Sequence, residues 1–194
     1  MTRGPVALFG PGGEPLRSAA LALAEAGRPI GLATLAAEQQ QEFASASIAN
    51  ELWVLGADHL HRVIDAAEPA AAGAYLAELE DRFGPLAACV LDPGPLPAIA
   101  FDECSLDEWL AVARRQLAAV LAAARAAIPL LERRGGGALL VVRHPAPPGA
   151  AAAVLDAALG TLPGALAAEY AGRPLHFAAA GASHLPAALL AALA

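Results

Sequence analysis

Charged, sulfur-containing and aromatic residues are all scarce in this sequence, which is 16% charged and 5% aromatic. Its two cysteines, Cys89 and Cys104, lack the CxxC spacing of redox and zinc motifs, so we expect reduced thiols in a cytosolic protein. Only 12 Lys and Arg stand against 19 Asp and Glu, and the formal net charge is −7 without a basic run. This balance disfavours binding to nucleic acid or to an anionic membrane surface.

The sequence also lacks the long apolar runs of secreted and membrane proteins. After Met1–Arg3, only a short apolar run precedes the glycine-rich Gly10–Gly13, which does not make a signal peptide. The most helix-like stretch, residues 105–133, contains several Arg and Glu and is interrupted by Pro129. We therefore expect a cytoplasmic protein without a membrane span.

Hydrophobic residues, in contrast, are abundant, at 57% of the 194 residues. This proportion excludes a disordered chain and leaves little polar surface. The length predicts one domain over residues 1–194. The shortage of polar surface predicts that another subunit covers part of the apolar surface.

Strand-like and helix-like segments alternate along the chain, which is typical of a parallel sheet covered by helices on both faces. A capping box, Ser105 with Glu108, starts the longest helix. Residues 35–60 give no clear prediction, because 48–55 fit a helix or a strand equally. The expected strands are 5–10, 29–34, 61–65, 86–91, 138–142 and 175–180, and the expected helices are 14–26, 69–83, 105–133 and 150–170, before an apolar tail at 184–194.

Three stretches narrow this fold class. In these stretches the sequence resembles the short-chain dehydrogenase/reductase family. The stretches are Ala7–Gly10 with the helix that Gly27 ends, the helix from Trp109 through Gln116, and residues 165–172. The resemblance runs from residue 5 to about 182. It implies a three-layer α/β/α, Rossmann-like, doubly wound parallel sheet of about six strands that lacks the family's seventh strand. It also implies NAD(P), if any cofactor is bound.

The glycine turn of that family is altered here. Gly10, Gly12 and Gly13 remain at positions where glycines let a backbone approach a pyrophosphate. Glu14 and Leu16 replace the last two glycines of the motif. A carboxylate at a helix N-terminus takes the place of a phosphate and repels it. Alternatively, Glu14 is a solvated residue of the first helical turn, and either interpretation weakens the case for a bound dinucleotide.

The other cofactor positions are mixed. Thr34, at the end of the second strand, offers neither the acidic group that binds ribose hydroxyls nor a basic group for a 2′-phosphate. The resemblance implies that Asp65 stands at the position where the family has an aspartate that contacts the adenine of the cofactor. Asp65 could equally cap the following helix, which we expect. We predict no bound cofactor.

The catalytic set implied by the resemblance is Asn, Ser, Tyr and Lys, and none of the four remains. The corresponding residues are Gln116, Arg143 or His144, Ala152 and Asp156. A methyl group cannot deliver a proton to a carbonyl, and a carboxylate raises rather than lowers the pKa of a neighbouring phenol. The sequence therefore predicts a dehydrogenase fold without dehydrogenase chemistry.

Two other kinds of chemistry are weaker candidates. His144 and Asp156 would make a general base if they were neighbours, but no nucleophile stands out beyond Ser183 or Cys89. His59 and His61 have the spacing of two metal ligands without a third. We expect a surface histidine pair and no metal site.

The helices at 105–133 and 150–170 argue for a partner subunit. Between Gln116 and Leu131 the only charge is Arg125, and between Gly149 and Ala168 it is Asp156. Helices that are apolar nearly all round are buried on their outer face also, and the resemblance implies a four-helix interface here. We expect an inactive structural or regulatory subunit, either a homodimer or the partner of an active paralogue. The alternatives are an NAD(P)-dependent oxidoreductase with a rearranged site and a small-ligand-binding protein that uses the vestigial cleft.

Overall fold

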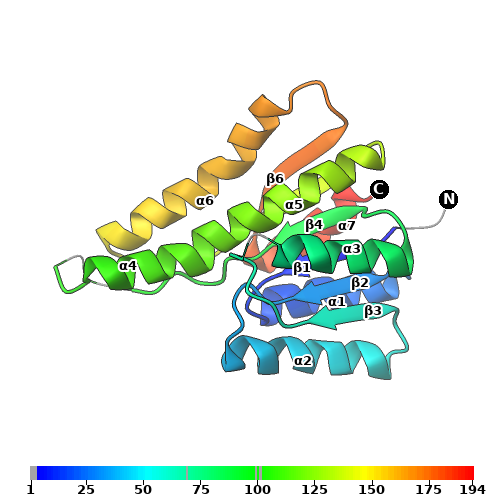
Figure 1. The fold of residues 1–194 in the computed structure, drawn as a ribbon, viewed down its shortest axis with the longest axis horizontal. Coiled ribbons are helices and arrows are strands. Elements are labelled where there is room, and N and C mark those ends of the chain that lie inside the picture. Colours follow the sequence, from blue (N-terminus) through cyan, green and yellow to red (C-terminus); the bar gives the residue numbers. More distant parts are fainter. Residues whose placement is uncertain (1–3, 69, 99, 101) are drawn as a thin grey trace.

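The computed structural model describes residues 4–68, 70–98, 100 and 102–194. Its core is one parallel sheet of six strands in the order β3-β2-β1-β4-β5-β6 (Figure 1). The strand order reverses between β1 and β4, so the crevice typical of such sheets lies beyond the carboxyl ends of these two strands. The strands are β1 (Val6–Phe9), β2 (Ile30–Ala33), β3 (His59–Arg62), β4 (Ala88–Leu91), β5 (Gly137–Arg143) and β6 (Leu175–Gly181).

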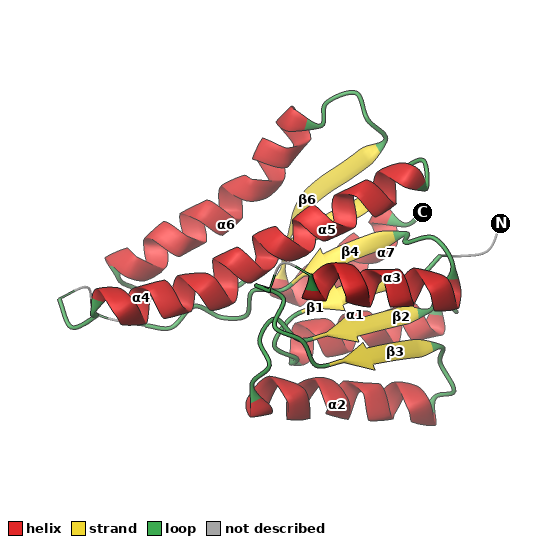
Figure 2. Ribbon diagram, viewed as in Figure 1, coloured by secondary structure: helices red, strands yellow, loops and turns green. Residues whose placement is uncertain are grey.

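Helices cover both faces of the sheet, which confirms the three-layer prediction (Figure 2). One buried cluster joins the sheet to α1, α2 and α7, and another joins the opposite face to α3, α5 and α6. Apolar strand residues alternate between the two clusters, as expected for a sheet buried on both sides. The helices are α1 (Glu14–Glu25), α2 (Gln39–Val54), α3 (Ala71–Phe83), α4 (Leu106–Ala113), α5 (Ala119–Arg133), α6 (Ala150–Glu169) and α7 (Leu185–Ala192).

The segment 35–60 resolves into the long helix α2 and the start of β3. The predicted third strand is present, but its expected bounds of 61–65 are wrong, because β3 begins at His59 and ends at Arg62. The Thr34 side chain explains the early end. Its hydroxyl donates to the Ile64 carbonyl at 2.7 Å and accepts from the Ile64 amide at 2.8 Å, in place of backbone partners. On α2, the Trp53 side chain is 75% exposed and does not belong to the core.

The helix expected at 105–133 is present, with one irregular turn. Its capping box is confirmed, since the Ser105 hydroxyl accepts from the Glu108 amide at 3.2 Å and the Glu108 carboxylate accepts from the Ser105 amide at 2.9 Å. A π-helical turn, Arg114–Ala118, separates α4 from α5. Such turns often lie at functional sites, and this one contains Gln116.

Helix α6 continues through Pro163, which is buried. By length and composition alone, it is apolar enough to cross a membrane, with a mean hydropathy of 1.5. Its buried residues, among them Leu155 and Leu159, pack toward the sheet, while much of its outer surface is exposed. The N-terminal ends of α4 and α6 extend together beyond the sheet (Figure 2).

Candidate functional site

The loops that follow β1 and β4 are pressed together at the reversal of strand order. A Cβ added to Gly10 would lie 2.9 Å from Asp92 Cβ, and one added to Gly94 would lie 2.9 Å from Pro11 Cγ. Only glycine permits this approach. Five cavities of the described chain open elsewhere, and none of these five is lined by the glycine turn, Asp92 or His144.

Asp92 and His144 form the most buried polar contact at this edge. Asp92 follows β4 and is 2% exposed, and one carboxylate oxygen accepts from the Gly94 amide at 2.9 Å. The same oxygen lies 2.6 Å from Nε2 of His144, which follows β5. The hypothesis that His144 pairs with Asp156 was therefore wrong. A carboxylate that holds an imidazole is one part of a general base.

No nucleophile accompanies this pair among the candidates from the sequence. Ser183 is an exposed residue of a short 3-10 helix after β6. Cys89 lies inside β4, and burial raises the pKa of its thiol well above the usual range. A protonated, inaccessible thiol does not attack a substrate.

Arg143 and Asp156, which stand at positions of the implied catalytic set, are bound to each other. Arg143 ends β5, and its Nη2 donates to Asp156 Oδ1 at 2.6 Å. The guanidinium lies directly against Gly160 of α6, where an added Cβ would overlap with it. The third position, Ala152, is buried within the same helix and offers only a methyl group.

Gln116, on the π-helical turn, is tied to the loop after β4. Its Nε2 donates to the Pro95 carbonyl at 2.9 Å. Its Oε1 is buried without a hydrogen-bond partner in the described structure, and so is Nε of Arg143. A buried polar atom without a partner costs about 1–3 kcal/mol, so these two atoms are the unsatisfied groups of the site.

The glycine turn is present, but helix α2 lies against it. Gly12 has φ +74°, and an added Cβ would lie 2.7 Å from Ala44 Cβ and 2.8 Å from the Ser45 amide nitrogen. The Glu14 side chain is 73% exposed and accepts from the Ser18 hydroxyl at 2.6 Å. This placement favours the interpretation of Glu14 as a solvated residue of the first turn.

Asp65 lies in the loop after β3 and does not cap α3, so that prediction was wrong. Its Oδ1 accepts from the Ala67 amide at 3.0 Å, and its Oδ2 lies 3.4 Å from Nη2 of Arg114. Arg114 also donates to Glu68 at 2.6 Å. Helix α3 begins at Ala71 without a side-chain cap. The carboxylate of Asp65 is thus already engaged by the chain.

The sequence did not single out Gln41, a residue of the first turn of α2 whose side chain reaches the loop after β2. Its Oε1 accepts from the amides of Leu35 and Ala36, at 3.1 Å each. Nearby, Arg115 of the π-helical turn donates to Glu38 at 3.1 Å and so joins two segments 77 residues apart. The polar run Gln39–Gln41 after a buried strand was the available signal.

The histidine pair on β3 serves packing and hydrogen bonding. His61 Nε2 lies 2.9 Å from the Ser45 hydroxyl, and His59 Nδ1 lies 2.9 Å from the Ala57 carbonyl. Within the described residues, no group of three His, Cys, Asp or Glu side chains is placed to hold a metal ion. Burial lowers the pKa of His61, and the nearby His59 and Arg62 lower it further.

This shift predicts a loss of stability on mild acidification. The unfolded chain takes up a proton at His61 near the usual pKa, whereas the folded chain resists it, so stability falls as pH decreases from 6.5 through the folded pKa. We expect His61→Gln, which keeps a polar partner for Ser45, to lower this pH dependence. Urea unfolding of both proteins across this range measures it, and an unchanged slope in the variant contradicts the prediction.

Comparison with known proteins shows which solved structures have a similar architecture. No family model and no curated protein matches the sequence. Solved structures match over most of the chain. One is a short-chain dehydrogenase/reductase from Mycobacterium marinum, with 20% identity and a TM-score of 0.80 over 92% of this chain and 73% of that one. Another is a gluconate 5-dehydrogenase from Burkholderia cenocepacia in complex with NADP and tartrate, with 25% identity and a TM-score of 0.77 over 93% and 72%.

A third match is a short-chain oxidoreductase from Pseudomonas aeruginosa described as containing an atypical catalytic center. It has 22% identity and a TM-score of 0.76 over 90% of this chain and 68% of that one. The chain therefore has the fold of the short-chain dehydrogenases/reductases. The sheet of the described residues has six strands and lacks the seventh strand that the resemblance implies for the family.

Proposed function

We propose that this protein is a non-redox subunit with the fold of the short-chain dehydrogenases/reductases. It acts as a structural or regulatory component, as a homodimer or as the partner of an active paralogue. The single observation that carries the proposal is the ion pair of Arg143 with Asp156, 2.6 Å long, beside the methyl group of Ala152. Two positions of the implied catalytic set are used to bind each other.

Carbonyl reduction needs a proton donor beside the reacting oxygen. Ala152 has none, and the Asp156 carboxylate is held by a guanidinium seated on Gly160. The remaining dyad of Asp92 and His144 joins the ends of β4 and β5 and is nearly buried. These contacts stabilise the fold at the place where a reactive site would lie.

The residues at this edge disfavour the binding of a dinucleotide. Pro11 and Gly94 meet across the reversal point, and α2 lies on Gly12. Glu14 adds a carboxylate at the start of α1, where a pyrophosphate would be bound. The proposal therefore assigns no cofactor and derives no step through one.

The outer face of α4 and α6 supports the subunit role. Leu106 is 71% exposed, and Val154 is 57% exposed. Several exposed residues that follow Val154 on α6 are small, including Ala157, Thr161 and Gly164, which allow close approach of a second helix. Because these helix ends extend beyond the sheet (Figure 2), another subunit can pack on them without covering the rest of the molecule.

One observation favours a second candidate, the small-ligand-binding protein. Gln116 Oε1 is an unpaired acceptor and Arg143 Nε an unpaired donor, and both are buried at the same end of the sheet. A small polar molecule that reached either atom would supply its missing hydrogen-bond partner. A metabolite that stays bound through purification would favour this function over the subunit role.

Titration with NADH and NADPH tests the proposal. We expect no change in nicotinamide fluorescence or melting temperature at millimolar cofactor, because the pyrophosphate and catalytic positions are both altered. The matched assay is carbonyl reduction with the same batches of protein and a broad panel of aldehydes and ketones. Micromolar binding together with turnover would instead support the oxidoreductase alternative with a rearranged site.

A further inference from the structure

Two backbone amides just beyond β2 are satisfied by a side chain of the same molecule. The N–H groups of Leu35 and Ala36 both donate to Oε1 of Gln41, at 3.1 Å each. In dinucleotide-binding sheets of this order, the end of the second strand faces the adenosine ribose. The oxygen of Gln41 thus lies where a hydroxyl or phosphate oxygen of a ligand would accept hydrogen bonds.

The helix that carries Gln41 also fills the neighbouring space. One turn after Gln41, Ala44 and Ser45 lie against Gly12, with the Ser45 amide nitrogen 2.8 Å from the position of an added Cβ. Ser45 itself is buried. The first two turns of α2 therefore contact the glycine turn after β1 and the loop after β2 at the same time.

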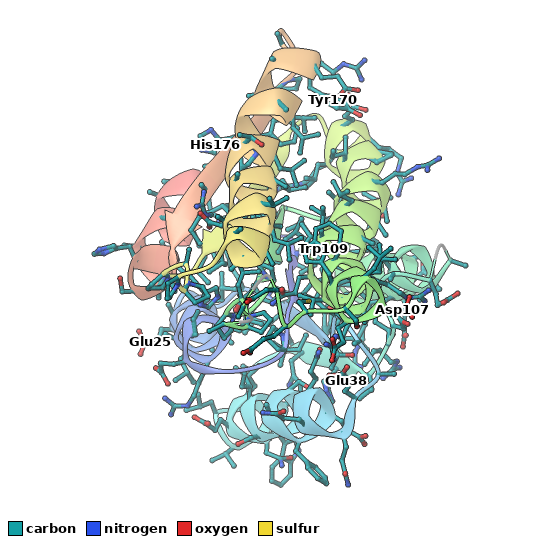
Figure 3. All side chains as sticks on the ribbon, turned by 90° about the vertical axis from the view of Figure 1, so that its left-hand side faces the viewer. Glu25, Glu38, Asp107, Trp109, Tyr170 and His176 are labelled. Carbon is teal, nitrogen blue, oxygen red and sulfur yellow. The ribbon has the colours of Figure 1, made fainter. Side chains whose placement is uncertain are left out.

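A contact from the opposite side holds the start of this helix. Glu38 precedes α2 and accepts a hydrogen bond from Arg115, at 3.1 Å. Figure 3 shows Glu38 between α2 and the long helix of α4 and α5. Both side chains are about half exposed, at 44% and 49%. An ion pair of this kind contributes little to stability, so it supports the position of the α2 start only weakly.

We propose that Gln41 is an internal stand-in for a ligand oxygen and that the first turns of α2 close the nucleotide half of the crevice. This inference rests on the proposed non-redox function. It gives one structural reason why the part of the crevice that would bind the adenosine of a cofactor is closed. A side chain held on the same chain competes at a high effective concentration. A ligand must break both hydrogen bonds before it gains its own.

Gln41→Ala tests this inference with ADP-ribose as the probe. ADP-ribose has the adenosine and the pyrophosphate but lacks the nicotinamide, so the Asp92–His144 contact does not affect the result. Two hydrogen bonds of ordinary net strength correspond to about a thirtyfold gain in affinity. We expect the variant to bind ADP-ribose about thirtyfold more tightly than the unaltered protein, as measured by calorimetry.

The chain offers a matched control in the adjacent residue. Gln40 lies on the same helix and is exposed. Gln40→Ala makes the same chemical change and is expected to leave ADP-ribose affinity unaltered. Gln41→Glu keeps an acceptor for both amides and adds a negative charge, so it is expected to remain closed to the probe.

Amide hydrogen exchange provides a readout independent of the ligand. Exchange at Leu35 and Ala36 is expected to be slow in the unaltered protein and in Gln41→Glu, and fast in Gln41→Ala. Two results would overturn the inference: ADP-ribose binding by the unaltered protein with the same affinity as the variant, or a folded Gln41→Ala with fast exchange that still does not bind. Neither result bears on the proposed subunit role, which depends on turnover and on molecular mass.

Discussion

Replacing Asp92 with alanine is expected to lower the free energy of unfolding by about 3 kcal/mol. Asp92 is almost fully buried, and its carboxylate binds both the Gly94 amide and His144 Nε2. Alanine leaves the amide and the imidazole without their partner in a place that water cannot reach. For a chain of this size, the loss corresponds to a decrease in melting temperature of roughly 6–12 °C.

Chemical and thermal unfolding check this result, and two variants serve as controls. Asp92→Asn keeps an acceptor for both partners and is expected to lose about 1 kcal/mol. Arg133→Ala removes a largely exposed guanidinium from its ion pair with Glu80, whose carboxylate keeps the Leu86 amide as a partner, and is expected to lose less than about 1 kcal/mol. If Asp92→Ala and Arg133→Ala have equal effects, the Asp92–His144 contact does not stabilise the fold.

Replacing Ala157 with arginine is expected to convert a dimer into a monomer. Ala157 is exposed on the outer face of α6, between Val154 and Thr161. A small residue lets a second helix approach closely, and an arginine there both blocks this approach and places like charges across a two-fold axis. We expect light scattering to give twice the 19.5 kDa chain mass for the unaltered protein and the single mass for the variant.

The control for this experiment is Ala77→Arg, which makes the same change on an exposed position of α3. It is expected to stay dimeric. A monomeric unaltered protein that remains monomeric at high concentration would contradict the homodimer. The regulatory role would then depend on a different partner chain with an intact catalytic set.

The sequence alone was sufficient for the fold class and for the prediction that the catalytic set is lost. The alternation of strands and helices can be predicted from short stretches of sequence, because backbone preferences and side-chain periodicity depend on neighbouring residues. The first strand, the first helix and the capping box of Ser105 all follow from such patterns. The substitutions at Ala152 and Asp156 required only a comparison of residue types with the catalytic set that the resemblance implies.

The pairing of side chains at the site was decided by the tertiary structure. Asp92 and His144 are 52 residues apart, and the sequence offered Asp156 as the nearer partner for His144. Asp156 instead binds Arg143, because Gly160 leaves room for the guanidinium on α6. The distance between two residues along the sequence does not indicate which of several carboxylates will lie beside a side chain at the end of a strand.

The path of the chain between β2 and β3 was also set in three dimensions. Thr34 binds Ile64 through its side chain and ends β3 early, and Gln41 takes the amides that follow β2. Each of these hydrogen bonds satisfies a polar group that packing would otherwise leave buried and unpaired. These polar groups become buried only once the sheet has formed. Only the folded chain therefore determines which side chain supplies their hydrogen-bond partner.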